Sequence, residues 1–236
     1  MTLTARIDDH ERPATPEQTR QATPASVPEV SSIRLVLTLG VAGVLAGLLL
    51  VLVFKATEPA ILRNKAAALE IAVQEVLKAP ARYETLYVLD DRLAPELPEG
   101  RTERDTERVF LGFDAEDHPV GFAVTAGEPG FQDIVRLIFG YQPESRTVLG
   151  MKVLESKETP GLGDKIEKDL AFVSQFEGAR APLLGVKAGQ GNDSDPAEID
   201  MITGATISSK AVIRIINNKL EVLRPLLEAY DPETRP

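Results

Sequence analysis

The sequence predicts an α+β protein with one N-terminal transmembrane helix, and three observations support this. A charge-free apolar run spans Leu35–Phe54, four short strand-like runs follow between residues 108 and 155, and a helical apolar pattern lies near the C-terminal end. Strands that are followed by helices, rather than alternating with them, are typical of the α+β class. We therefore expect an antiparallel sheet with flanking helices, joined to a single membrane span.

The composition and charge exclude several classes of function. The 236 residues contain 36 acidic and 26 basic side chains, for a net charge of -10, and no cysteine. An acidic chain without clustered basic and aromatic residues does not favour nucleic acid as a partner. The absence of cysteine excludes disulfides, thiolate catalysis and iron–sulfur clusters, so any redox chemistry needs a borrowed cofactor. The two histidines, His10 and His118, have no partner at ligand spacing, and no metal site is predicted.

The N-terminal part of the chain indicates a polar tail and a membrane span. Residues 1–33 are rich in Pro, Ser and Thr and lack apolar runs, which predicts a disordered tail. The apolar residues Leu35–Phe54, closed by Arg34 and Lys55, would span roughly 30 Å as a helix, the thickness of a bilayer's hydrocarbon core. A buried helix of a soluble domain and a cleaved signal peptide are weaker alternatives, because the run is apolar on every face and too long for a signal peptide.

Two features of this span stay open. Basic residues flank it on both sides, so the positive-inside rule does not decide its orientation. Gly43 and Gly47 have the small-xxx-small spacing that lets transmembrane helices approach closely, although glycine is also common in spans without such a contact.

After the span, the chain predicts a helix, a connecting segment and then strands. The stretch from residue 59 to residue 80 is rich in Ala and Leu between two prolines, and a charged, turn-rich stretch follows it. The predicted parts are a tail (1–33), a transmembrane helix (34–55), a juxtamembrane helix with connecting segment (56–100) and a domain (101–230). The strand-like runs of the domain are Arg108–Phe113, Val120–Ala126, Asp133–Tyr141 and Arg146–Glu155.

The first of two motifs, ESKETPGLGDKI (Glu155–Ile166), directly follows the fourth strand-like run. Its Thr159-Pro160-Gly161 favours a type II turn, since proline presets φ and glycine accepts the left-handed conformation. Gly163 would allow a second close approach of the backbone. An ordinary strand-to-helix turn explains the same residues, and the missing third glycine argues against a dinucleotide fingerprint.

The second motif, AEIDMITGATISSKAV, spans residues 197–212 and opens a helix. Apolar residues from Val212 onward recur at helical spacing, so the helix is predicted to begin close to Gly204 and to stop or kink at Pro225. Hydroxyl and carboxyl side chains crowd its start, namely Asp200, Thr203, Thr206, Ser208 and Ser209. A helix N-terminus with free N–H groups and small residues can bind a phosphate, and an ordinary N-cap is equally compatible with these residues.

The stretch Asp200–Thr206 resembles the D-x-x-[ST]-G-A-[TS] signature of FMN-binding domains that carry flavin covalently. In that family a flavin transferase uses FAD to attach FMN by a phosphoester to the last hydroxyl residue, which implies Thr206 here and not Thr203. The stretch from residue 157 to residue 166 is similar to a second block of the family. Its Lys157 and Asp164 resemble the G subunit of the Rnf electron-transport complex more than the C subunit of the sodium-pumping quinone reductase.

The resemblance implies a flavin site that is built from both motifs. Thr206 would carry the FMN phosphoryl group, and Asp200 would serve recognition by the transferase. The further cofactor-binding residues would be Thr203, Gly204, Ala205, Ser208 and Ser209 in the second motif and Thr159, Gly161, Leu162 and Gly163 in the first. Ser156 stands where many G subunits have His. No acid/base pair and no nucleophile with a histidine is visible, so no independent catalytic site is expected.

The resemblance implies a flavoprotein of the inner membrane, with its FMN domain on the extracytoplasmic side. Such a protein relays electrons within an Rnf-type complex that couples electron transfer to ion translocation. Its partners would be the other membrane and redox subunits and, during maturation, the flavin transferase. Two alternatives stay open: a free-standing membrane-tethered FMN module for electron transfer or sensing, and a non-redox anchored binding module.

Overall fold

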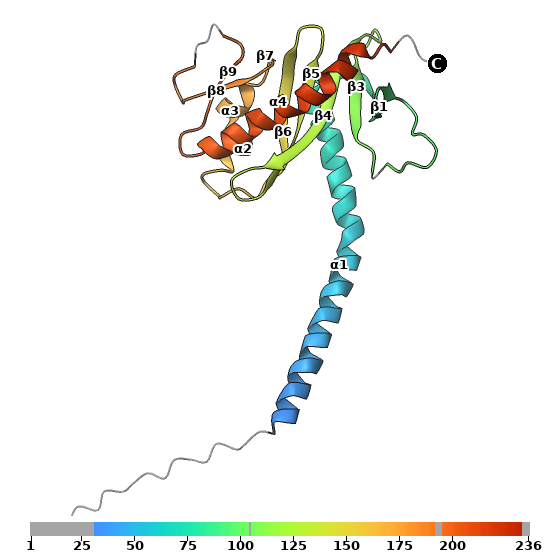
Figure 1. The fold of residues 1–236 in the computed structure, drawn as a ribbon, viewed down its shortest axis with the longest axis vertical. Helices are drawn as coiled ribbons and strands as arrows, with labels where there is room; N and C mark the ends of the chain where they lie inside the picture. Colours follow the sequence, from blue (N-terminus) through green and yellow to red (C-terminus); the bar gives the residue numbers. More distant parts are fainter. Residues whose placement is uncertain (1–30, 104, 192–194, 233–236) are drawn as a thin grey trace, which may run out of the picture. The chain divides into compact units, whose positions relative to one another are not determined.

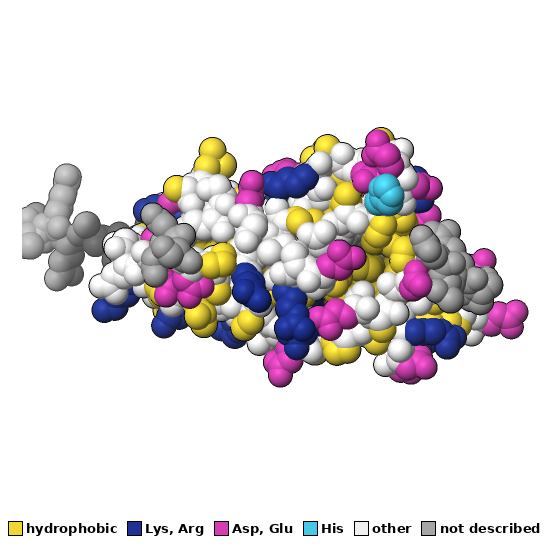
Figure 2. Space-filling model, turned by 90° about the horizontal axis from the view of Figure 1, so that it is seen from above, with side chains coloured by type: hydrophobic (Ala, Val, Ile, Leu, Met, Phe, Trp, Pro, Cys, Tyr) yellow, Lys and Arg dark blue, Asp and Glu magenta, His cyan; other side chains and the backbone are white. Residues whose placement is uncertain are grey.

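The computed structural model describes residues 31–103, 105–191 and 195–232. Nearly all of the predicted tail, residues 1–33, lies outside these described residues. The chain separates into two units, Met1–Ala56 and Thr57–Pro236, and the second contains the sheet. Basic and acidic side chains are interspersed on the face seen in Figure 2, in keeping with the mixed charge of the sequence.

One continuous helix, α1 (Ser32–Val76), takes up both the predicted membrane span and most of the predicted juxtamembrane helix. Among the described residues it is the one helix long and apolar enough to cross a membrane, which suggests membrane anchoring. The side chains of its Leu35–Phe54 stretch are exposed throughout. Pro59 lies inside α1, although the sequence predicts a helix start there. The proline removes one hydrogen bond, and the Ala- and Leu-rich turns after it favour continuation of the helix.

A seven-stranded antiparallel sheet with the order β2-β1-β3-β4-β5-β6-β7 forms the centre of the second unit. Its strands are β1 (Arg82–Val88), β2 (Leu93–Ala94), β3 (Arg108–Phe113), β4 (Pro119–Pro129), β5 (Ile134–Gln142), β6 (Thr147–Glu155) and β7 (Ala179–Arg180). Pairing of consecutive strands from β3 to β6 confirms the predicted meander. The predicted α+β class is likewise confirmed.

The first two strands lie where the sequence predicts a connecting segment. The alternation of Tyr83, Thr85 and Tyr87 in β1 is typical of a strand, and β1 pairs with β3 from Arg82 to Tyr87. The sheet therefore begins before residue 101, the predicted start of the domain.

Helices cover both faces of this sheet (Figure 1). On one face α4 (Thr206–Ala229) packs against the main core through Val212, Ile215, Ile216, Leu220 and Leu223. On the other face the end of α1 forms a second buried cluster with the sheet, made of Ala72, Val73, Val76, Leu77, Phe110, Ala123 and Ile138. Full burial of a large apolar side chain contributes about 1.5–3 kcal/mol, so each helix is held by several such contributions.

The last helix, α4, continues through Pro225 to Ala229, although the sequence predicts that Pro225 stops or kinks it. Leu227, beyond the proline, is buried in the main core. This packing offsets the hydrogen bond that the proline removes.

Short elements connect β6 to α4 and bring the two motifs together. They are α2 (Lys165–Lys168), α3 (Leu170–Ser174), β7, β8 (Leu184–Val186) and β9 (Glu198–Asp200), with β8 and β9 paired in parallel. Asp169 caps α3 by accepting a hydrogen bond from the Ala171 N–H. Figure 1 shows α2, α3, β8 and β9 grouped beside the beginning of α4. The first motif, which begins at the last residue of β6, and the second motif, which contains β9 and the start of α4, therefore lie at the same end of the sheet.

Candidate functional site

The second motif forms a tight turn and an uncapped helix start. Thr203 and Gly204 lie in the turn, and Gly204 has a φ of 82°, which glycine adopts without strain. Ala205 occupies the N-cap position, where it cannot supply a side-chain hydrogen bond, and Thr206 is the first residue of α4. The side chains of Thr203 and Thr206 are exposed. The N–H groups of this first turn and the positive end of the helix dipole are therefore available to an anion beside Thr206.

Ser208 and Ser209 differ from the threonines because both are buried and have protein partners. Ser209 Oγ donates to the carbonyl of Ala205 at 2.9 Å and accepts from the Ile202 N–H at 3.2 Å. Ser208 Oγ donates to Glu158 Oε2 at 2.6 Å. A phosphate contact from either hydroxyl, as predicted, would have to replace one of these hydrogen bonds.

Glu158 joins three separate segments at this end of the sheet. The residue is 5% exposed, and its carboxylate accepts hydrogen bonds from the backbone N–H groups of Phe131 at 2.9 Å and Gln132 at 3.1 Å, in addition to the Ser208 hydroxyl. The β4–β5 turn, the first motif and the beginning of α4 are thus tied to one side chain.

Burial by itself would raise the pKa of the Glu158 carboxyl. The hydrogen bonds from Ser208 and from the backbone N–H groups of Gln132, Phe131 and Asp133 outweigh this effect, so the pKa lies below its usual value. Glu158 is therefore ionised at neutral pH, and its hydrogen bonds are of the stronger, charge-assisted kind.

Two glycines leave the room that Glu158 needs. A Cβ atom at Gly163 would lie 2.6 Å from Glu158 Oε2 and 2.9 Å from Ser208 Oγ, and one at Gly130 would lie 2.5 Å from Glu158 Oε1. The close approach predicted at Gly163 is therefore confirmed, and the neighbour it admits is this carboxylate.

The predicted turn of the first motif is also present. The Leu162 N–H donates to the carbonyl of Thr159 at 3.1 Å, and Gly161 has a φ of 76°, as position i+2 of a type II turn requires. A Cβ atom at Gly204 would lie 3.8 Å from Leu162 Cδ2, so the turn of the first motif reaches the turn of the second.

Large exposed apolar side chains surround this junction. Phe131, Leu162 and Ile207 come from the three segments that Glu158 joins, and they are 62%, 50% and 55% exposed. Exposed large apolar groups on segments that also carry polar ones are typical of a ligand or protein contact. An aromatic, partly apolar ligand that carries a phosphate would match both the helix start and these side chains.

Asp200 is the last residue of β9 and precedes the exposed Thr206 by six positions in the chain. Its N–H donates to Gln175 Oε1 at 2.6 Å, and its Oδ1 accepts from the Gly191 N–H at 3.0 Å. Among the described residues, no group of three His, Cys, Asp or Glu side chains is placed to hold a metal ion. The hydrogen bond from Gly191 gives the Asp200 carboxylate a structural contact, besides its predicted role in recognition by the transferase.

Lys157 and Asp164, the two charged residues by which the first motif resembles the G subunits, each form an ion pair with a nearby residue. Lys157 binds Asp133 at 2.8 Å, and Asp164 binds Lys168 at 2.7 Å. The hydrogen bond from Lys157 lowers the pKa of Asp133, and that from Lys168 lowers the pKa of Asp164. Ser156 Oγ accepts from the Glu158 N–H at 3.2 Å and so helps to orient the residue at the centre of the junction.

Sequence reasoning misses Glu158, Phe131 and Ile207 as site residues. An acidic side chain beside Lys157 is usually solvated, so nothing in the local pattern marks Glu158 as buried. Its one sequence signal is its position directly before the Thr159-Pro160-Gly161 turn.

The junction of the two motifs lies in a part of the chain that matches a family of flavin-binding domains. The family model of the FMN-binding domain matches residues 130–221, from the β4–β5 turn to most of α4. Both motifs and the Glu158 junction lie inside this match.

Curated relatives give the family. The chain is 36% identical over 150 residues to the G subunit of the ion-translocating oxidoreductase complex of Salmonella typhimurium, covering 58% of this chain and 65% of the relative. It is 32% identical over 160 residues to the G subunit of the Na(+)-translocating ferredoxin:NAD(+) oxidoreductase complex of Acetobacterium woodii, covering 66% of this chain and 74% of the relative. The chain belongs to this family of G subunits, and it spans just under two thirds, 65%, of the length of the Salmonella relative.

Solved structures show the same fold. NqrC of Shewanella oneidensis has a TM-score of 0.61 at 17% identity, covering 71% of this chain and all of that chain. The C subunit of the Na(+)-translocating NADH-quinone reductase of Parabacteroides distasonis has a TM-score of 0.51 at 22% identity, covering 63% of this chain and 79% of that chain. At these identities the likeness extends to the fold alone.

Proposed function

We propose that this chain is a membrane-anchored flavoprotein subunit that carries FMN on Thr206 through a phosphoester. In this proposal it relays electrons within an Rnf-type complex that couples electron transfer to ion translocation. The observation that carries the proposal is the exposed Thr206 hydroxyl at an uncapped helix start, held against the first motif through Ser208 and Glu158.

The residues at the junction fit FMN. A phosphodiester on Thr206 Oγ1 would keep one negative charge, which the N–H groups and the dipole of α4 stabilise. Leu162 and Ile207 supply exposed apolar surface for an aromatic ring system, and Gly204 leaves the backbone accessible. When bound, FMN supplies the capacity to accept and release electrons, while the protein positions it and tunes its potential.

Each hydroxyl and carboxylate of the second motif has a proposed task. The Thr206 hydroxyl is a poor nucleophile and needs activation by the transferase. Its oxygen then bonds to the phosphorus of the FMN half of FAD, AMP leaves, and the hydroxyl proton is released. Asp200 and Thr203 shape recognition by the transferase. Ser208 and Ser209 hold the helix start in place through their protein hydrogen bonds.

The membrane helix and the relatives support the proposed setting. We infer that α1 anchors the chain in the inner membrane, that the FMN domain is extracytoplasmic, and that the partners are the other membrane and redox subunits of the complex. The names of the curated relatives, which describe subunits of ion-translocating complexes, support these partners. A covalent bond keeps the flavin in place where free flavin is scarce.

In-gel flavin fluorescence after denaturation tests the attachment. The full chain, expressed with a flavin transferase, should give a fluorescent band that is lost in Thr206→Ala and kept in Thr206→Ser. Ser174→Ala is the matched control, because it removes an exposed hydroxyl outside both motifs and should keep the band. Fluorescence that persists in Thr206→Ala contradicts the attachment residue.

Copurification tests the complex separately. The tagged full chain, extracted from native membranes, should bring multi-span membrane subunits with it. A chain that carries flavin but purifies alone would favour the free-standing FMN module.

A further inference from the structure

The amide side chain of Gln175 bridges the backbone of Asp200, the first residue of the signature in the second motif. Gln175 Oε1 accepts a hydrogen bond from the Asp200 N–H at 2.6 Å, and Gln175 Nε2 donates to the Asp200 carbonyl at 3.2 Å. One planar amide thus uses its acceptor and one of its donors on a single residue. Two such bonds fix both the position and the orientation of the Asp200 backbone.

This bridge takes the place of a neighbouring strand. In the two-stranded sheet of β8 and β9, the Met201 N–H donates to the carbonyl of Val186 at 2.9 Å. Successive residues of a strand turn their backbone groups to opposite sides, so the N–H and C=O of Asp200 face away from β8. Gln175 satisfies both groups on that side, and its removal would leave them without these partners.

The chain around Gln175 is held by the core of the domain. Gln175 is the C-cap residue of α3, and Asp169 caps the other end of this helix. Phe172 and Phe176, on either side of Gln175 in the chain, are buried in the main core, with their ring centroids 5.2 Å apart in an edge-to-face contact. A hydrogen bond from such a supported position restrains its partner closely, so Asp200 is held against the core through Gln175.

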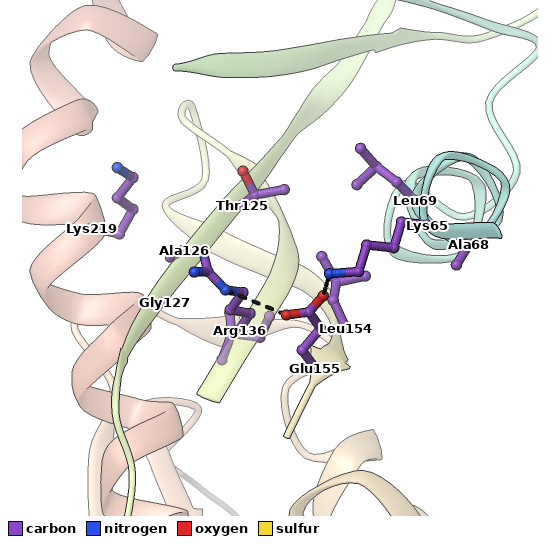
Figure 3. Close-up of a pocket in the computed structure, with 11 residues that line it drawn as sticks. Lys65, Ala68, Leu69, Thr125, Ala126, Gly127, Arg136, Leu154, Glu155 and Lys219 are labelled. Carbon is purple, nitrogen blue, oxygen red and sulfur yellow. Dashed lines mark ion pairs between the residues drawn. The ribbon is translucent and has the colours of Figure 1, made fainter. Parts of the chain in front are cut away.

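The bridge leaves part of the Asp200 carboxylate available to a partner. Its Oδ1 accepts from the Gly191 N–H at 3.0 Å, whereas Oδ2 makes no hydrogen bond or ion pair with the residues that the structure describes. Glu155, at the start of the first motif, differs in this respect, because it pairs with Lys65 of α1 through one oxygen and with Arg136 of β5 through the other (Figure 3). Asp200 therefore retains a carboxylate oxygen for an external contact.

We propose that Gln175 is a positioning residue for flavin attachment, because it holds Asp200 where the transferase recognises its carboxylate. Gln175 and Asp200 together line two hollows, of about 210 and 520 Å³, and Thr203 lines the larger one. A partner that enters these hollows would therefore meet the second motif beside the bridge. Without the bridge the carboxylate would sample several positions, and fixing one of them would weaken binding. The inference rests on the proposed function, since it concerns recognition by the transferase.

The kinetics of flavin attachment test this inference. The acceptor is the full chain, purified in detergent without flavin, and in-gel fluorescence gives initial rates with the transferase and FAD. Gln175→Ala should raise the KM for the acceptor about tenfold and change kcat by less than about twofold, because recognition and not chemistry is impaired. Gln190→Ala removes the same amide from an exposed position of the same domain and should leave both constants unchanged.

A double-mutant cycle separates positioning from a general weakening of the fold. Asp200→Asn removes the charge that Gln175 is proposed to position, so adding Gln175→Ala to it should raise KM little further. If Gln175→Ala raises KM by the same factor with and without the Asp200 charge, the inference is overturned. A wild-type KM in Gln175→Ala overturns it too, while attachment to Thr206 would still support the proposed function.

The pH dependence of Gln175→Glu gives a second test that needs no change at Asp200. The new carboxyl group can accept from the Asp200 N–H, but only its protonated form can donate to the Asp200 carbonyl. The charged groups that line the two hollows are one lysine and five carboxylates, namely Lys165, Asp169, Glu177, Asp195, Glu198 and Asp200. These carboxylates and the carbonyl disfavour a further negative charge, so they raise the pKa of the introduced group.

The attachment rate of Gln175→Glu relative to wild type should therefore recover as the pH falls from about 8 to about 5. The relative rate of Gln175→Ala should stay low over the same range, because alanine cannot regain a donor. A relative rate of Gln175→Glu that does not change with pH overturns the inference. Failure of the wild type to accept flavin would instead contradict the proposed function, and the inference with it.

Discussion

Replacing Glu158 by alanine tests whether one buried carboxylate holds the site together. The change removes hydrogen bonds from Phe131, Gln132 and Ser208, at 2.9, 3.1 and 2.6 Å. Each hydrogen bond to a charged group contributes about 1.5–3 kcal/mol, and burial of the carboxylate costs several kcal/mol, so we expect a net loss of about 2–4 kcal/mol. For a domain of this size that corresponds to a fall in Tm of about 5–15 °C.

Thermal unfolding of the full chain in detergent, followed by circular dichroism, measures this loss. Glu177→Ala is the matched control, because Glu177 is an exposed carboxylate paired with Lys78, and its removal should cost no more than about 1 kcal/mol. The fraction of chains with covalent flavin should also fall in Glu158→Ala, since Ser208 is the second residue after Thr206. A Tm equal to that of the control would refute the role given to Glu158.

The difference in stability between the wild type and Glu158→Gln should depend on pH with a definite sign. Because the folded-state pKa of Glu158 lies below its usual value of 4.5, the ionised side chain stabilises the fold above that usual value. The advantage of the wild type over Glu158→Gln should therefore be complete at pH 7 and decline as the pH falls below about 4.

Three further predictions concern neighbouring residues. Gly163→Ala should lower the free energy of unfolding by about 1–3 kcal/mol, because its Cβ would press on Glu158. Gly161→Ala has open space around it and should lower it only by the strain of the positive φ, about 1–2 kcal/mol. Urea unfolding measures both losses. Ser209→Ala should cost about 1–2 kcal/mol but leave flavin attachment intact, as in-gel fluorescence would show. Arg214→Ala should raise the pKa of Glu128 toward its usual value, because the hydrogen bond that opposes its burial is lost, and an NMR titration of the Glu128 carboxyl would detect this.

Local signals are sufficient to predict the meander and the turn of the first motif. Turn residues bound each strand from β3 to β6, and Thr159-Pro160-Gly161 specifies its own backbone conformation. The continuation of α1 through Pro59 and of α4 through Pro225 cannot be predicted in this way. Proline propensity favours a boundary, and packing of Leu227 in the core overrides it in α4.

The site can be predicted only in part, for a similar reason. The exposed position of Thr206 follows from the start of an amphipathic helix, which the sequence shows. The contact between Glu158 and Ser208 joins residues that lie far apart in the chain, and only the path through β7, β8 and β9 brings them together. Which of the hydroxyls are buried is therefore a property of the tertiary structure.

Tandem mass spectrometry of the tryptic peptide that contains residues 200–209 is the sharpest test of flavin attachment. The full chain, expressed with its transferase, should yield fragment ions that place the FMN phosphoryl group on Thr206 and on no other residue of the peptide. Attachment at Thr206 would be contradicted by fragment ions that place the group on Thr203, Ser208 or Ser209, or by a peptide that stays unmodified while the transferase modifies a known substrate.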